Sequence, residues 1–191
     1  MQKNNKTYNY KDMLKVVKGL VLKKLDQQSR WDLHILPVVK YAKKLGKIYH
    51  ADLEVLEISA FLHDLTRMTG DKNNHHISSA LIAGDLLSEL GFPEKRVKLV
   101  QDCIRNHRGS LNSERKTIEE VILTTSDAMA HIMFPLPMFW GCYKETQKNL
   151  SISEGRDWVL SKVLRSYKKI YFPEARKLVS KKYAAIKLVL S

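Results

Sequence analysis

Five histidines and aspartates of this sequence are the wrong residue types for the places they occupy. His34, His63, His107 and Asp127 each lie on the apolar face of a helical pattern, and Asp64 directly follows His63. Any one of them alone is compatible with a hydrogen-bonded core residue. Several titratable groups in one core are costly to desolvate unless something neutralises them. A divalent cation does so, and a mixed set of imidazole and carboxylate donors suits Mn, Fe, Co, Ni, Zn or Mg. The pattern therefore predicts a metal site.

The order of these residues carries a family resemblance. WDLHILPVVKYA, AFLHDLTR and TTSDAMAH present His34, the doublet His63-Asp64, and Asp127 in that sequence. This arrangement resembles the HD-domain superfamily of metal-dependent phosphohydrolases, over about residues 29 to 132. The resemblance implies a helical bundle in which these four residues ligate a metal ion.

Two further segments extend the resemblance to a second ion. NNHHISSALIAGDLL and CIRNHRGS are similar to the segments in which binuclear members of the superfamily place two more histidines. His75 and His107 are the implied ligands, with Asp64 placed to bridge one ion to the other. His76 is the alternative to His75. The complete pattern resembles the diadenosine tetraphosphate hydrolase-like branch, whereas the GYP motif of cyclic-dinucleotide phosphodiesterases is absent.

Cationic side chains near these ligands are expected to receive phosphate charge. Arg67 follows the doublet by one turn and is predicted to act in catalysis together with Asp64. Lys72 and Arg108 are predicted to bind substrate, with ordinary surface charge as the alternative. His131 has no counterpart in the pattern, but it follows Asp127 by four residues and so could face the same pocket.

The function expected from the resemblance is hydrolysis of a phosphate ester or anhydride by metal-activated water, with a phosphorylated small molecule, a nucleotide above all, as substrate. One alternative is a di-iron oxygenase on the same fold. Another is a non-catalytic protein that binds nucleotides or RNA, which a net charge of +13 favours. That charge is uneven: basic segments at both ends flank an acidic middle that holds most of the predicted ligands.

An all-α single domain over residues 1–191 is predicted to position these side chains. Glycines and prolines are few and fall mostly between segments with a helical repeat. The expected core covers about 29–132, with an N-terminal helix at 10–25 and a helical extension at 133–191. The expected helices are 10–25, 29–45 with a stop at Gly46, 52–65 with Asp52 as N-cap, 76–90, 93–107 opening at Pro93, 117–132, and one or two helices over 154–189 broken near Pro173.

The remaining expectations concern surroundings. The loop 108–116 and the segment 133–150 are expected to form pocket walls, and FPLPMFW within the latter is read as a lid, a contact in a homo-oligomer, or a packed crossover. Cys103 and Cys142 are expected to be free thiols. The sequence has no apolar run long enough for a membrane span and begins with no secretory segment, so no membrane contact and a cytoplasmic location are expected.

Overall fold

The computed structural model describes residues 8–25, 28–108, 114–145 and 150–191, with backbone alone for residues 144 and 145. Across those residues the chain forms helices and no strand, as predicted. The elements are α1 (Tyr10–Lys24), α2 (Gln28–Arg30), the π-helical η1 (Trp31–Ile35), α3 (Leu36–Ile48), α4 (Leu53–Leu62), the 3-10 turn η2 (Arg67–Thr69), α5 (His75–Glu89), α6 (Glu94–Asn106), α7 (Ile118–Met133), α8 (Leu136–Trp140), the π-helical η3 (Gly141–Glu145), α9 (Ile152–Lys168) and α10 (Pro173–Leu190).

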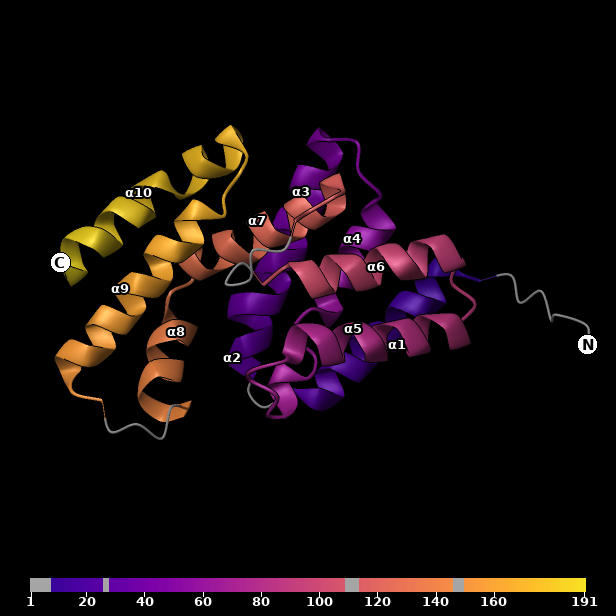
Figure 1. Ribbon diagram of the computed structural model, residues 1–191, viewed down its shortest axis with the longest axis horizontal. Helices are drawn as coiled ribbons and strands as arrows, with labels where there is room; N and C mark the ends of the chain where they lie inside the picture. The colour runs from indigo at the N-terminus through magenta and orange to yellow at the C-terminus, as the bar shows by residue number, and fades with distance from the viewer. Residues whose placement is uncertain (1–7, 26–27, 109–113, 146–149) are drawn as a thin grey trace, which may run out of the picture.

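Helices α3 and α7 lie between two groups of helices (Figure 1). On one side are α1, α4, α5 and α6, with α5 packed along α6. On the other side are α8, α9 and α10, so the first and the last of the described helices, α1 and α10, lie in different groups. Because α7 packs against α3, α6, α9 and α10, its side chains reach both groups.

Local chemistry explains where the principal helices begin. Asp52 caps α4, since its side chain accepts hydrogen bonds from the backbone of Glu54 and Val55, both at 3.1 Å, which confirms its predicted role. Thr117 and Glu120 form a capping box at the start of α7. Pro173 occupies the first turn of α10, so the predicted break near this residue is confirmed.

Two features of the α2–η1–α3 segment differ from the expectation. Gly46 does not stop α3, which continues to Ile48, because the missing side chain lets Leu53 and Leu56 pack directly against the α3 backbone. Residues 31–35 are π-helical rather than α-helical. Most of FPLPMFW forms the short helix α8.

A continuous apolar core lies beneath the predicted ligands. Its largest fully buried side chains include Leu45, Leu56, Phe61, Ile104 and Leu123, from α3, α4, α6 and α7. Cys103 and Cys142 are free and buried. None of the described helices combines the length and apolar character needed to cross a membrane.

Candidate metal centre

Helix ends supply half of the six predicted ligands. His63 follows the last residue of α4, His75 is the first residue of α5, and His107 follows the last residue of α6. His34 lies in the π-helical segment η1, a distortion that often marks functional sites. Asp127 alone sits inside a regular helix, α7.

The two carboxylate oxygens of Asp64 face different histidines. Oδ1 lies 3.3 Å from Nε2 of His75 and 3.9 Å from Nε2 of His107. Oδ2 lies 3.4 Å from Nε2 of His34 and 3.8 Å from Nε2 of His63. Each side thus forms a three-residue group whose donor atoms lie within 4.8 Å of one another. One carboxylate joins the two groups.

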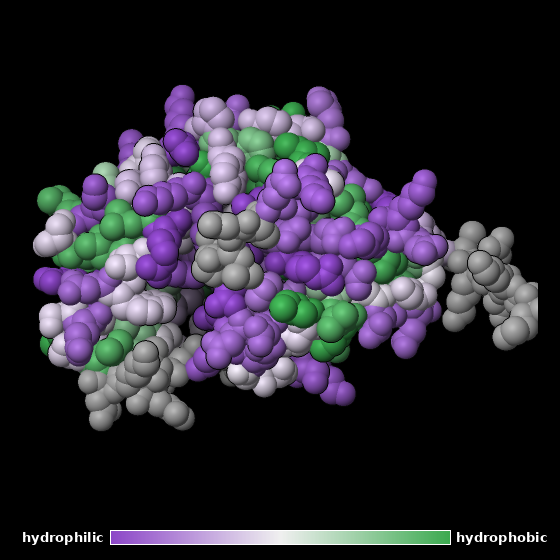
Figure 2. Space-filling view, viewed as in Figure 1, coloured by the Kyte–Doolittle hydropathy of each residue, from purple (hydrophilic) through white to green (hydrophobic). Residues whose placement is uncertain are grey.

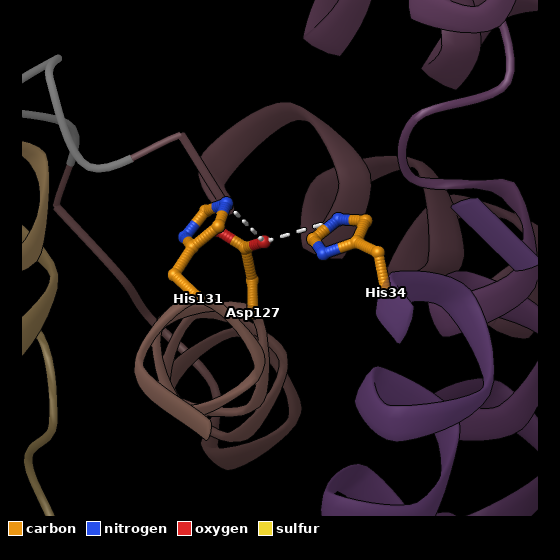
Figure 3. A group of neighbouring side chains, drawn as sticks. All are labelled: His34, Asp127 and His131. Carbon is orange, nitrogen blue, oxygen red and sulfur yellow. Dashed lines mark ion pairs between the residues drawn. The ribbon is translucent and has the colours of Figure 1, made fainter. Parts of the chain in front are cut away.

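Asp127 and His131 form a third group with His34 (Figure 3). The Asp127 carboxylate points between the two imidazoles, with Oδ1 3.5 Å from Nε2 of His34 and 3.7 Å from Nε2 of His131. The same oxygen lies 3.9 Å from Nε2 of His63. The structure therefore brings all six predicted ligands together, with His131 as a seventh side chain.

Backbone carbonyls determine which ring nitrogen of three histidines carries a proton. Nδ1 of His63 donates to Ala60 O at 2.8 Å, and Nδ1 of His107 donates to Ile104 O at 2.5 Å. Nδ1 of His75 donates to Lys72 O at 3.3 Å. Because a carbonyl only accepts, each neutral imidazole keeps its lone pair on Nε2, which points at the carboxylates.

These imidazole lone pairs and the carboxylate oxygens are all hydrogen-bond acceptors, and they face one another without a donor between them. Such an arrangement favours a cation between them. Nε2 of His34 and of His63 are also only 3.2 Å apart. The donor set consists of buried imidazole nitrogens and carboxylate oxygens, with the tautomers of His63, His75 and His107 set by backbone carbonyls, and it fits divalent transition metals or magnesium. The residues present therefore fit the metal that the sequence predicts.

Burial and neighbouring charge hold these groups in ligand-ready protonation states. Burial lowers the pKa of His107 to about 3, and burial also lowers the pKa of His75 and, strongly, of His131. Burial by itself would raise the pKa of Asp64 and Asp127, but the surrounding histidines, joined at Asp64 by Arg67, outweigh it and hold the pKa of both acids well below the usual range. Near neutral pH these three imidazoles are neutral and both acids are charged.

A cavity of about 760 Å³ opens beside this cluster. Asp64, His34 and His131 lie at its wall together with the three predicted phosphate-binding cations, Arg67, Lys72 and Arg108. Nε of Arg67 lies 3.8 Å from Oδ2 of Asp64. Arg108 donates to the carbonyl of Asn73 and so ties the end of α6 to the loop before α5.

A family comparison decides the identity of the fold. The HD domain family model matches residues 32–131, just over half of the chain. The chain belongs to the HD domain family. HD domains bind divalent metals, and the histidine and aspartate groups described above could hold such ions.

Solved structures share the fold of this HD protein over nearly its whole length. Bacillus subtilis YpgQ has a TM-score of 0.72 at 17% identity, and the Listeria innocua protein Lin1889 has 0.70 at 16%; each match covers 95% of this chain and 93% of the other. A predicted HD superfamily hydrolase from an uncultured Thermotogales bacterium has a TM-score of 0.63 at 20% identity, covering 92% of this chain and 88% of that one.

One curated relative matches in sequence. An uncharacterized protein of Methanocaldococcus jannaschii is 30% identical over 91 residues, which is 45% of this chain and 49% of that protein. The chain thus spans about half the length of the curated relative it matches.

The structure shows which of the two adjacent histidines, His75 or His76, faces the cluster. His76 is also buried, but its Nδ1 has no hydrogen-bond partner among the described residues and it joins none of the three groups. His75, the favoured ligand of the HD pattern, is the one that faces Asp64.

Helix α9 and Lys169, the residue after its end, supply cavity residues that the sequence analysis missed. Lys162, Arg165 and Lys169 line a second cavity of about 240 Å³ with Asp64 and Asp127. Trp158, also on α9, lines both cavities. In the sequence, only the helical spacing of these residues indicates that they share a face, and a solvated helix face has the same spacing.

The expected pocket walls are present in part. Arg108 from the loop 108–116 and Pro137, Met138 and Gly141 from the segment 133–150 line the larger cavity. Residues 109–113 and 146–149 of these two stretches lie outside the described residues.

Proposed function

We propose that this HD protein is a metal-dependent phosphohydrolase that cleaves a phosphate ester or anhydride, with a nucleotide as substrate. The observation that carries the proposal is the position of Asp64, whose two oxygens face two separate histidine groups beside an open cavity. A packing role for these residues gives no reason for so many acceptors to converge.

The proposed ligands divide between two ions. His34, His63 and Asp127 would hold one, His75 and His107 would hold the other, and Asp64 would bridge them. When bound, such ions lower the pKa of a coordinated water so that hydroxide forms near neutral pH, and they offset charge on phosphoryl oxygens. The identity of the metal is a matter for elemental analysis, among Fe, Mn, Co, Ni, Zn and Mg.

Three side chains of the chain are proposed to orient the phosphate. Arg67 lies against Asp64 and is two-thirds buried, so its guanidinium is held beside the bridging carboxylate, where a phosphoryl oxygen would lie. Lys72 and Arg108 line the same cavity and would bind the rest of the substrate's negative charge. Cationic contacts of this kind fix the phosphorus in line with the attacking water.

A direct test combines elemental analysis with a screen of phosphorylated compounds. Protein purified without chelator should contain a divalent metal and should hydrolyse a nucleotide when candidate metals are added back. Asp64→Asn should lower kcat/KM more than about a hundredfold, since loss of a ligand exceeds the effect typical of outer residues. Asp85→Asn, an exposed acid on α5, is the matched control and should leave the activity unchanged.

The same preparations distinguish the alternatives. Bound iron together with oxygen consumption on an organic substrate, and no phosphate release, would replace the proposal with an oxygenase. RNA binding that weakens steeply with salt and survives Asp64→Asn, again without hydrolysis, would replace it with a non-catalytic function.

A further inference from the structure

One face of α9 carries a row of cations outside the part of the chain that the family model matches. Lys162 and Arg165 lie on α9 and Lys169 directly follows its last residue; their spacing of three and four residues places them on the same side. All three line the 240 Å³ cavity, and residues of the metal centre form its opposite wall. In the space-filling view, hydrophilic side chains gather on both sides of the boundary between α9 and the α5–α6 pair (Figure 2).

The charge of Asp127 acts on Lys162 and Lys169, but no acid among the described residues forms an ion pair with this row. Within the described part of the chain, none of the three side chains forms a hydrogen bond or an ion pair, although the backbone of Lys169 bonds to Ser166 and Thr125. Lys162 and Lys169 are partly buried, and burial is the largest influence on the pKa of each; it lowers the pKa of Lys162 to about 8. The charge of Asp127 raises the pKa of both lysines, and the charges of neighbouring cations lower it. Partly buried like charges without partners are costly, and an anion in the cavity would remove that cost.

The two acids that line this cavity already contact the histidines of the metal centre. Asp64 and Asp127 line it, but their oxygens face the histidine groups of the metal centre. Arg67 and Arg108 line the cavity as well, so the cationic side chains there outnumber the carboxylates even before any metal is bound. A single phosphoryl group on the metals, beside Arg67, would leave the α9 row without a counter-charge.

We propose that Lys162, Arg165 and Lys169 form a second phosphate-binding subsite, so that the substrate class is a phosphoric anhydride, with one phosphoryl group at the metal centre and the next along α9. This inference rests on the proposed function. It narrows that function from phosphate compounds in general to those with linked phosphates, such as nucleoside diphosphates and triphosphates.

The test measures binding without turnover. The full-length protein, with the metal it carries, is titrated calorimetrically with methylenediphosphonate, whose P–C–P link water does not cleave, and with methylphosphonate, which has one phosphoryl-like group. Metal content is measured after each titration. We expect wild type to bind the diphosphonate more tightly than the monophosphonate by at least about tenfold, because additional charge-assisted contacts form.

The variants assign that preference to α9. The double variant Lys162→Gln/Lys169→Gln should weaken diphosphonate binding at least about tenfold and methylphosphonate binding less than about threefold. Lys168→Gln, an exposed lysine on α9 that lines neither cavity, is the matched control and should change neither affinity. Arg165→Gln changes an exposed side chain, so it provides a second variant if the double variant does not fold; it should selectively weaken the diphosphonate about threefold.

The outcomes separate this inference from the proposed function. Equal weakening of both ligands, or no weakening of either, overturns the subsite even if the protein hydrolyses nucleotides. Selective loss of diphosphonate binding supports the subsite, and it does so even if no phosphorylated compound is hydrolysed, in which case the proposed reaction alone is wrong.

Discussion

Removing the metal should destabilise this protein by an amount that the placement of its ligands allows us to work out. The proposed donors run from His34 to Asp127 and come from five separate segments, so the unfolded chain retains almost nothing of the site. A metal that binds only the folded state stabilises it by about 4 kcal/mol when its free concentration is a thousandfold above Kd. For a chain of this length, each kcal/mol moves Tm by about 2 to 4 °C. Chelation should therefore lower Tm by about 8 to 16 °C per ion.

The assay is thermal unfolding followed by circular dichroism, with metal, after chelation, and after metal is returned. Asp64→Asn should reduce the metal-dependent shift to less than about 3 °C, because both donor groups lose a negative ligand. Asp85→Asn should keep the full shift. Two results would refute the reasoning: a wild-type Tm that ignores removal of bound metal, or an undiminished shift in Asp64→Asn.

Three further predictions concern the scaffold in its chelated form. His107 has a pKa of about 3 in the folded state and about 6.5 in the unfolded state, so the unfolded chain binds the extra proton and stability falls as the pH drops below 6.5. Urea titrations at pH 5 should therefore show that this residue lowers the free energy of unfolding by about 2 kcal/mol. That loss should be absent in His107→Gln. Gly46→Ala should cost about 1 to 2 kcal/mol of unfolding free energy, because the new Cβ would lie 2.5 Å from Cδ1 of Leu56, and a stabilised variant would contradict this packing. Thr117→Ala should cost about 1 kcal/mol through loss of the α7 capping box, whereas Thr117→Ser should retain it.

The sequence predicted the principal helices because their boundaries depend on local chemistry. Asp52 and Pro173 act within a turn of their own positions, and caps of this kind can be read from one segment at a time. The end of α3 was predicted wrongly because Gly46 is used for a contact with α4, a partner that lies beyond a following loop. A glycine chosen for close packing and a glycine chosen as a stop look the same in the sequence.

The candidate site divides in the same way. The predicted ligands came from an ordered pattern of rare residue types on apolar faces, and the structure brings that set together. Lys162 and Lys169 could not be recognised from residue type and order, because lysines at helical spacing are common on solvated surfaces. Only the packing of α9 against α7 shows which lysines face the cluster. The candidate metal ligands could thus be predicted from residue type and order, whereas the proposed subsite could be found only from tertiary packing.

The position of the ligands at helix ends has a physical reason. The last carbonyls of a helix lack a partner within the helix, so they are available to side chains that follow. His63 and His107 each use such a carbonyl, three residues back, to hold the proton on Nδ1 and turn Nε2 toward the carboxylates. His75 also donates to a carbonyl three residues back, that of Lys72 in the loop before α5, although His75 stands at the start of its helix. The hydrogen bond at the end of the helix therefore also orients the metal ligand. This explains why a histidine-aspartate doublet at the end of an apolar helix indicates a metal site.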